Sequence, residues 1–108
     1  MSRTPRGRGS LSPGQFDRIA KALADPRRFA LLQAIAAESE CPCQQLIRQF
    51  PVTKATISHH AKELLRAGLI EAQREGQCVF FTVRREVLEQ YTAELLRRVG
   101  SSTGVLTG

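Results

Sequence analysis

Apolar residues in the first third of the chain recur at the spacing that places them on one face of a helix. Two such stripes each follow a helix-starting signal, first Ser12-Pro13 and then Asp25-Pro26, in which a side-chain oxygen can cap the helix and proline fits its first turn. The pattern therefore predicts helices over residues 13–24 and 26–37. The stripes consist of Phe16, Ile19, Ala20 and Leu23, followed by Phe29, Leu32, Ile35 and Ala36.

The next two predicted helices are joined by a short turn. A helical segment over residues 43–49 is ended by Pro51, and Thr53 is placed to cap a helix over residues 54–67 that finishes before Gly68. Two helices joined by so short a turn have the dimensions of a helix-turn-helix. The side chains expected to face inward are Leu46, Ile47, Phe50, Ile57, Ala61, Leu64 and Leu65.

A β-hairpin and a last helix follow. Residues 69–74 and 78–83 are rich in strand-forming side chains, and Glu75-Gly76-Gln77 between them is typical of a hairpin turn. Apolar side chains at helical spacing then predict a helix over residues 85–99. These side chains are Leu88, Tyr91, Leu95 and Val99. The order of elements predicts a mainly α fold with a β-hairpin, namely a winged helix-turn-helix of five helices with a two-stranded wing.

The length of 108 residues is enough for one domain, which the pattern places at residues 12–99. Residues 1–11 and 100–108 are rich in small and polar side chains without apolar periodicity, so we expect a flexible basic N-terminal arm and a flexible C-terminal tail. No apolar run has the length of a membrane span, and the N-terminus lacks the apolar stretch of a secretory signal. A cytoplasmic protein without a membrane partner is the expectation.

Basic residues outnumber acidic ones by 16 to 10, which gives a formal net charge of +6. Residues 48–85 hold seven bases against three acids, and the arm adds Arg3, Arg6 and Arg8. Such a local excess is typical of a protein that binds a polyanion such as double-stranded DNA, although a solvated basic face would carry the same charge.

Three stretches carry specific motifs at the junctions of the predicted elements. They are Leu23 to Arg28 (LADPRR), Thr56 to His60 (TISHH), and Leu65 to Ile70 (LRAGLI) followed by Arg74-Glu75-Gly76. In this order and spacing they resemble the ArsR/SmtB family of small winged-helix repressors, over residues 14–96. The resemblance implies a homodimeric transcriptional repressor that binds a palindromic DNA operator and responds to a ligand or to redox chemistry.

The predicted helix over residues 54–67 has a polar, short-chain face opposite its apolar stripe, which suits a major groove. Lys54 can reach guanine O6 and N7 or a phosphate, and Ala55 can contact a thymine methyl group. Ser58 and His59 can form hydrogen bonds with base edges, and Lys62 lies on the same face. Thr56 is expected to support local packing or to contact a phosphate. The resemblance also places Arg74 and Gln77 of the wing near the phosphate backbone or the minor groove.

His60 lies next to the apolar Ala61 and matches a histidine that recurs in the family at this point. Neighbouring residues on a helix point about 100° apart, so His59 and His60 cannot easily share one metal ion. We therefore expect His60 to form a hydrogen bond within its helix or to another element.

The first and last helices carry more apolar surface than a small monomer should expose, so we expect them to form the homodimer interface. A dimer also doubles the small DNA interface of a single module. The expected interface residues are Phe16, Leu23, Leu88, Tyr91 and Leu95.

Three cysteines, with Cys41 and Cys43 separated by one proline, do not make the disulfide framework of a secreted protein. The pair resembles the Cys-x-Cys of the arsenic- and cadmium-sensing members of the family, which makes it a candidate site for As(III) or Zn(II). Oxidation of the thiols and a purely structural role, with Cys43 as a small buried apolar residue, are the alternatives. The sequence does not place Cys78, in the wing, relative to the pair.

Two other classes of function remain open on the sequence. One is a winged-helix adaptor that binds protein rather than DNA, because fold does not dictate function. The other is a thiol redox or metal-handling protein that uses Cys41 and Cys43. No Ser/His/Asp or Cys/His constellation accompanies these thiols, so no enzymatic activity is expected.

Overall fold

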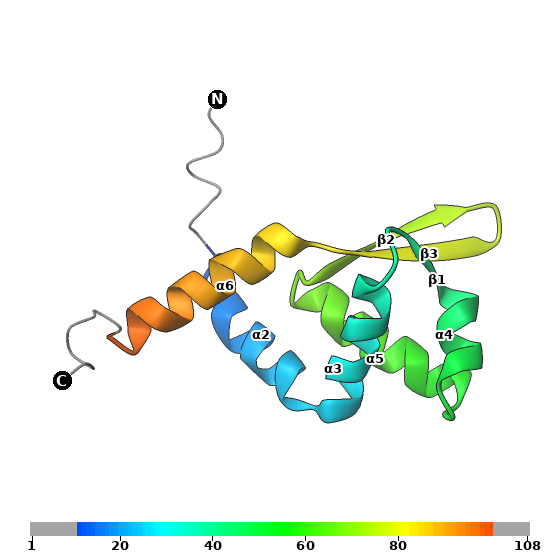
Figure 1. Ribbon diagram of the computed structural model, residues 1–108, viewed down its shortest axis with the longest axis horizontal. Coiled ribbons are helices and arrows are strands. Elements are labelled where there is room, and N and C mark those ends of the chain that lie inside the picture. Colours follow the sequence, from blue (N-terminus) through cyan, green and yellow to red (C-terminus); the bar gives the residue numbers. More distant parts are fainter. Residues whose placement is uncertain (1–10, 101–108) are drawn as a thin grey trace.

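The computed structural model describes residues 11–100 of the chain (Figure 1). Residues 1–10 of the predicted arm, with Arg3, Arg6 and Arg8, and nearly all of the predicted tail lie outside these residues. In chain order the described elements are α2 (Gln15–Ala24), α3 (Pro26–Ala36), β1 (Cys41–Pro42), α4 (Cys43–Gln49), α5 (Lys54–Arg66), β2 (Ile70–Glu75), β3 (Cys78–Val83) and α6 (Arg85–Arg98). The helix order and the hairpin agree with the prediction of a winged helix-turn-helix.

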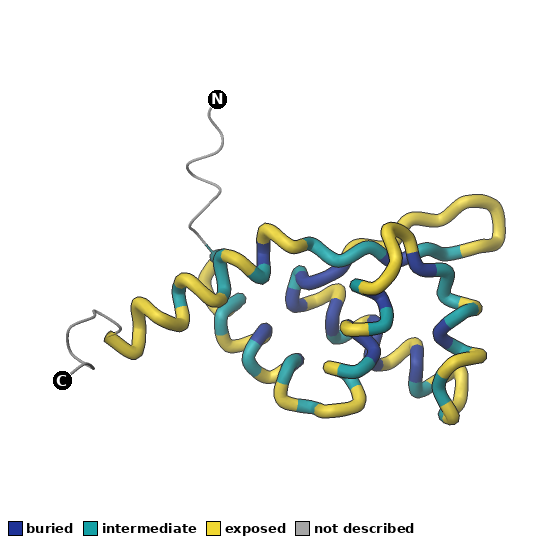
Figure 2. Tube along the Cα trace, in the orientation of Figure 1, coloured by how far each residue is buried: buried dark blue, intermediate teal, exposed yellow. Residues whose placement is uncertain are grey.

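Helices α2, α3 and α5 pack against one another around the core. Each contributes a fully buried aliphatic side chain, Ile19 from α2, Ile35 from α3 and Leu64 from α5. Burying a side chain of this size stabilises the fold by about 1.5–3 kcal/mol. Figure 2 shows the buried segments gathered in the centre of the molecule, while the tip of the wing and the end of α6 are exposed.

The sheet of the wing has three antiparallel strands in the order β1-β3-β2, so the prediction of a two-stranded wing was wrong. The additional strand, β1, is two residues long and pairs Cys41 with Phe81 and Pro42 with Phe80. Two residues are too few to show strand periodicity, and proline in a strand is tolerated because it lies at the edge of the sheet. Only the packing of this segment against β3 makes it a strand.

The hairpin turn holds two residues, Gly76 and Gln77, because Glu75 pairs with Cys78 across the strands. The sequence predicted a three-residue turn that included Glu75. Gly76 has φ +66°, whereas no non-glycine residue in the described chain has a positive φ. A two-residue loop with glycine at its first position matches the twist of the flanking strands.

Helix α2 begins two residues later than the sequence predicted. Gly14, with φ +81°, precedes its first residue, and no side chain caps the helix. The Ser12 hydroxyl donates to Gln15 Oε1 (3.1 Å) and does not accept from the helix. The Gln15 side chain in turn donates from Nε2 to the Ala67 carbonyl (3.0 Å), which joins the start of α2 to the end of α5.

Helix α5 ends at Arg66, and Gly68, two residues later, has φ +79° as predicted for its left-handed position. The amide of Gly68 donates to Leu65 O and that of Leu69 to Leu64 O, both at 3.0 Å, so the last carbonyls are satisfied. The prediction that Leu65 is buried was wrong, since 38% of its surface is exposed. Leu64 continues the buried stripe of α5, and its chain neighbour is rotated away from the core.

Candidate nucleic-acid interface

The turn between α4 and α5 places the first residues of α5 at the surface. Thr53 Oγ1 accepts a hydrogen bond from the Thr56 amide (3.1 Å) and lies 3.0 Å from the Thr56 hydroxyl, which caps the first turn of α5. Ile57, Ala61 and Leu64 bury one side of the helix. The opposite side of α5 is therefore held in a fixed orientation toward solvent.

The predicted DNA-contacting side chains of α5 share this exposed side. The exposed ones are Lys54, Ala55, Ser58, His59 and Lys62, and Thr56 is half-buried. Within residues 11–100 neither lysine has a carboxylate within ion-pair distance, whereas Arg66 at the end of the helix pairs with Glu63 (3.1 Å). The face therefore presents two uncompensated positive charges beside short hydrogen-bonding side chains, which is the chemistry that a major groove accepts.

The wing places two further predicted residues at the same end of the molecule. Arg74 on β2 and Gln77 in the turn are both exposed. Arg74 pairs across the strands with Val79 and forms no ion pair with any of the described carboxylates. Figure 1 shows the hairpin extending past α4, beyond the helical body. An exposed arginine on a projecting hairpin can reach a phosphate that the helix does not.

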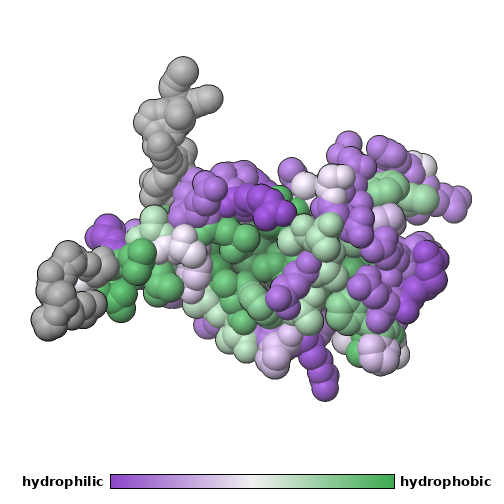
Figure 3. Space-filling model, viewed as in Figure 1, coloured by the Kyte–Doolittle hydropathy of each residue, from purple (hydrophilic) through white to green (hydrophobic). Residues whose placement is uncertain are grey.

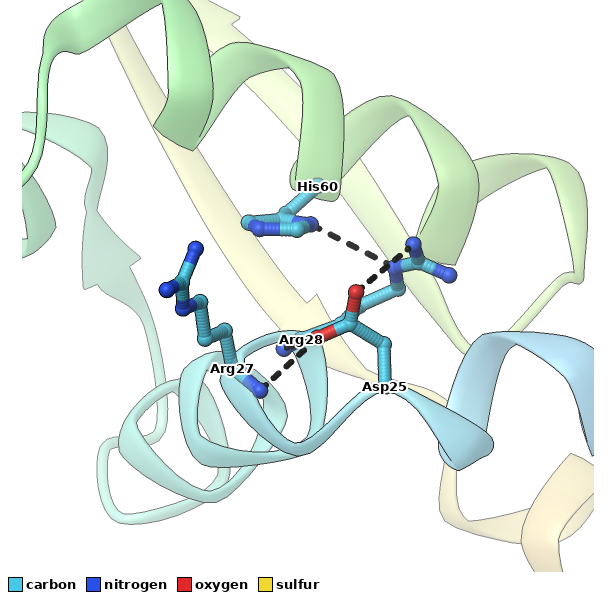
Figure 4. A network of polar contacts seen from close by, with 4 residues as sticks. All are labelled: Asp25, Arg27, Arg28 and His60. Atoms are coloured by element: carbon cyan, nitrogen blue, oxygen red, sulfur yellow. Dashed lines mark hydrogen bonds and ion pairs between the residues drawn. The ribbon is translucent and has the colours of Figure 1, made fainter.

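A polar network joins α3 to the middle of α5 (Figure 4). Asp25 Oδ1 accepts from the amides of Arg27 (2.9 Å) and Arg28 (3.3 Å), as expected for the cap of α3. Its other oxygen lies 3.5 Å from Arg28 Nη2. Arg28 Nε then donates to His60 Nδ1 (3.4 Å), which confirms the predicted hydrogen bond from His60 to another element.

His60 must be neutral in this network, because its Nδ1 accepts the hydrogen bond from Arg28. Burial lowers the pKa of His60, and the positive charge of Arg28 adds to this effect while the carboxylate of Asp25 opposes it. The hydrogen bonds from the Arg28 and Arg27 amides lower the pKa of Asp25. The network therefore favours a charged Asp25 and a neutral His60, and its hydrogen bonds fix the orientation of α5 relative to α3.

The sequence alone did not predict that Arg28 is the partner of His60. The two residues lie 32 positions apart, and nothing in either local pattern connects them. The available signal was that Arg28 and His60 each fall in one of the motifs that carry the family resemblance.

A family model described as a helix-turn-helix domain matches residues 23–73. The HTH-type transcriptional regulator CmtR of Mycobacterium bovis is 32% identical over 82 residues, which cover 76% of this chain and 69% of that protein. An arsenical resistance operon repressor of Staphylococcus xylosus is 27% identical over 85 residues, 79% of this chain and 81% of its own.

The chain belongs to the ArsR/SmtB family. Its fold also matches that of an ArsR-like transcriptional regulator from Rhodococcus sp. RHA1, with a TM-score of 0.69 and 24% identity over 82% of this chain and 81% of that one. A homodimeric winged helix-turn-helix domain from Mycobacterium bovis, described as a possible ArsR-family regulator, matches with a TM-score of 0.64 and 23% identity over 84% and 90% of the two chains. As an ArsR-family protein, the chain is a DNA-binding transcriptional regulator. Across residues 11–100 no helix is both long and apolar enough to cross a membrane.

The three thiols of this ArsR-family chain lie in different surroundings. Cys41, in β1, is fully buried, Cys43 is half-buried at the start of α4, and Cys78 is exposed at the start of β3. One interpretation of the sequence made Cys43 the small buried apolar residue, whereas Cys41 is the cysteine that the structure buries fully. Burial raises the pKa of Cys41, with the charges of Glu38 and Cys43 adding to it. Burial also raises the pKa of Cys43, and the Lys54 ammonium opposes this.

Within residues 11–100 of one chain, the side chains around Cys41 and Cys43 do not supply a complete donor set for As(III) or Zn(II). A thiophilic ion of this kind takes three or four Cys, His or carboxylate ligands. No group of three or more such side chains that could hold a metal occurs among residues 11–100. The carboxylate of Glu94 on α6 accepts hydrogen bonds from Arg97 (2.6 Å) and Arg98 (2.7 Å), which hold its pKa at about 2. These two arginines occupy it, so it is not available as a metal ligand.

The residues predicted for a dimer interface lie on α2 and α6. The rings of Phe16 and Tyr91 pack with centroids 5.0 Å apart, and the Arg98 guanidinium lies 3.9 Å above the Phe16 ring. Leu23 and Leu88 are half-buried against the core, and Leu95 is 40% exposed. Figure 1 shows the last turns of α6 extending past the helical body, and Figure 3 shows apolar surface along this end of the molecule. We call the exposed side chains of Leu95, Leu96 and Val99 the α6 apolar surface.

Proposed function

We propose that this ArsR-family chain is a homodimeric repressor that inserts one α5 helix per subunit into successive major grooves of a palindromic operator. The observation that carries the proposal is the exposed face of α5, where Lys54 and Lys62 have no carboxylate partner within residues 11–100. If this face were only solvated, nothing would require its two lysines to flank short hydrogen-bonding side chains, whereas a DNA-binding face requires this arrangement.

The proposed roles on α5 follow from position along the helix. Lys54 at the first turn and Lys62 two turns later flank Ser58 and His59. The two lysines contact phosphates, or in the case of Lys54 a guanine, while Ser58 and His59 hydrogen-bond with base edges and Ala55 meets a thymine methyl group. Thr56, half-buried beside its cap, positions the first turn or contacts a phosphate.

The wing adds contacts outside the major groove. Arg74 and Gln77 are exposed on the hairpin, so we assign them to the phosphate backbone or the minor groove beside the half-site. Such contacts raise the affinity for DNA but contribute little to the discrimination between base sequences.

Dimerisation is proposed through α2 and α6. Two recognition helices on a palindrome must be held about 34 Å apart, one turn of DNA, and this requires a rigid two-fold interface. The α6 apolar surface, together with Phe16, Leu23, Leu88 and Tyr91, offers the apolar area for it. The homodimeric Mycobacterium bovis domain with the same fold supports self-association.

The test begins with the reduced protein and a library of random-sequence duplex DNA, from which a bound sequence is selected. We expect a two-fold symmetric site. Replacing Lys54 or Lys62 by Ala should weaken binding to all duplexes and lower the slope of log affinity against log salt by about 1. Replacing Ser58 or His59 by Ala should instead cost about 1–3 kcal/mol on the selected site and relax the preference at one base pair.

Lys21→Ala is the matched control, because Lys21 is an exposed lysine on α2 and its loss changes the net charge equally. It should leave the affinity nearly unchanged. If Lys21→Ala weakens binding as much as Lys54→Ala does, only net charge matters and the assignment of α5 to the groove fails. Absence of salt-dependent binding to any duplex would favour the protein-binding adaptor instead.

A further inference from the structure

Two of the three thiols line one cavity between the wing and the helix-turn-helix. The cavity has a volume of about 370 Å³, and both Cys43 of α4 and Cys78 of β3 contribute to its wall. Lys54, the first residue of α5, and Gln77, in the hairpin turn, line it as well. The cavity therefore brings together two cysteines and two of the side chains proposed to contact DNA.

The pairing of the strands explains why these cysteines line the same cavity. β1 runs antiparallel to β3 and pairs Cys41 with Phe81 and Pro42 with Phe80. Extending this register by one residue places Cys43 opposite Val79, the chain neighbour of Cys78. Cys43 and Ile47 are four residues apart on α4, so they lie on the same side of the helix, and both line the cavity.

Cys41 is excluded from this cavity. Its partner Phe81 is buried, and Cys41 itself is fully buried with its thiol directed to the Pro42 carbonyl (3.8 Å). The motif Cys41-Pro42-Cys43 therefore does not act as one unit in the fold. The proline between the thiols carries the chain from the edge strand into α4.

We propose that Cys43 and Cys78 form a redox-sensitive thiol pair, which a hydroperoxide converts into a disulfide that ties the wing to the start of α4. This inference rests on the proposed DNA-binding function for its consequence. The chemical step itself does not depend on that function.

The reaction proceeds in two steps. The thiolate of the exposed Cys78 attacks one peroxide oxygen of hydrogen peroxide, the O–O bond breaks, sulfur is oxidised to a sulfenic acid, and the other oxygen leaves as water after taking up a proton. The Cys43 sulfur then attacks the sulfenic sulfur, its thiol proton passes to the departing oxygen, the S–S bond forms, and the S–O bond breaks with loss of a second water. Overall two thiols and one hydrogen peroxide give one disulfide and two waters.

The disulfide changes the DNA-binding surface because of what surrounds it. Gln77 is the chain neighbour of Cys78, and Lys54 lines the same cavity as both sulfurs. Disulfides require the two Cα atoms to lie within about 7 Å, so bond formation restricts where the hairpin can sit relative to α4 and α5. A hairpin fixed against α4 can no longer adjust to the phosphate backbone.

The experiment treats the full-length reduced protein with one equivalent of hydrogen peroxide. Peptide mapping without reductant should show one crosslinked pair of peptides that contains Cys43 and Cys78, and titratable thiols should fall from three to one. The oxidised protein should bind the selected duplex roughly tenfold more weakly, and dithiothreitol should restore binding. The mapping is done on the wild-type chain and does not depend on the folding of any variant.

Three variants complete the test. In Cys43→Ser the sulfenic acid on Cys78 should persist and react with dimedone, and in Cys78→Ser no intramolecular disulfide should form. Cys41→Ala, at the thiol outside the cavity, should still form the crosslink. Both Cys43→Ser and Cys78→Ser should keep their DNA affinity after peroxide.

Several results would overturn the proposal: a crosslink between Cys41 and Cys43, a disulfide between two chains, or no loss of thiols. A Cys43–Cys78 disulfide with unchanged DNA affinity would refute the regulatory consequence. If the reduced protein binds no duplex, the proposed function fails, whether or not the disulfide forms.

Discussion

Arg28 connects two parts of this molecule that are distant in sequence. Its guanidinium lies between Asp25, which caps α3, and His60, which sits on the buried side of α5. Since the Arg28 side chain is only 13% exposed, its hydrogen bonds are shielded from water. The orientation of α5, and with it the exposed DNA-binding face, therefore depends in part on one arginine outside the helix-turn-helix.

The protonation of His60 should make stability depend on pH. Its pKa is lowered in the folded protein, whereas the unfolded chain takes up the proton near pH 6.5. Between these values the unfolded state binds more protons, so stability is fully present above about pH 7 and decreases as the pH falls below 6.5. We expect the melting temperature of the wild type to fall more between pH 7 and pH 5 than that of His60→Gln, whose amide oxygen can still accept from Arg28.

His59→Gln is the control for this measurement, because His59 is exposed and no hydrogen bond joins it to Arg28 or Asp25. Its melting temperature should follow the wild-type pH dependence. Equal slopes for the wild type and His60→Gln would show that His60 does not couple protonation to folding.

At the scale of elements, the wing is the part least determined by the local pattern. Its third strand consists of Cys41 and Pro42, which become a strand only because they reach the edge of β3. Its two-residue turn depends on Gly76, whose φ of +66° is unfavourable for most side chains. The wing also carries Arg74 and Gln77, so its geometry bears directly on the proposed DNA interface.

Replacing Gly76 by Val tests the backbone conformation of the turn. No atom lies within 4 Å of an added Cβ, so the expected cost of about 1–2 kcal/mol arises from the left-handed conformation alone. Because the turn projects from the core, we expect a small change in melting temperature and a clear loss of DNA affinity. Gly76→Asn should largely retain both, since asparagine adopts this conformation more readily. Equal effects of Val and Asn on affinity would contradict the conformational explanation.

At the scale of the whole molecule, the two ends of the structure are exposed in different ways. The wing end presents Lys54, Lys62 and Arg74, which pair with no carboxylate among residues 11–100, and the α6 end presents the α6 apolar surface. Arg98 bridges α6 and α2 by lying over Phe16 while it pairs with Glu94. This arrangement holds α6 in place beyond the body, which a helix needs if it is to pair with a second copy.

A charge placed on the α6 apolar surface should therefore disrupt self-association. We expect Leu95→Asp to weaken the dimer by roughly 2 kcal/mol, or about thirtyfold in its dissociation constant, because the carboxylate would lose its water at the interface. Sedimentation equilibrium over a range of protein concentrations measures this change directly.

The matched control is Leu65→Asp on α5, since Leu65 and Leu95 have similar exposed fractions of 38% and 40%. It should leave the dissociation constant unchanged. A wild-type chain that remains monomeric at micromolar concentration would rule out the proposed dimer.

The sequence by itself determined the elements whose physics is local. Asp25 predicted the cap of α3, and Gly68 predicted the end of α5. The polar positions from Lys54 to Lys62 predicted a face of α5 that the structure leaves exposed. Caps, left-handed glycines and helical periodicity act within a few residues, so they can be recognised without knowing the fold.

Only the tertiary structure decided the relations between distant segments. It made a strand of Cys41 and Pro42, turned Leu65 outward, paired Arg28 with His60, and brought Cys43 and Cys78 to one cavity while it buried Cys41. Each of these outcomes depends on which surfaces pack together across many residues of chain. Packing of this kind leaves no periodic signal in the local sequence, and for that reason the thiol pair proposed here differs from the one that the motif indicated.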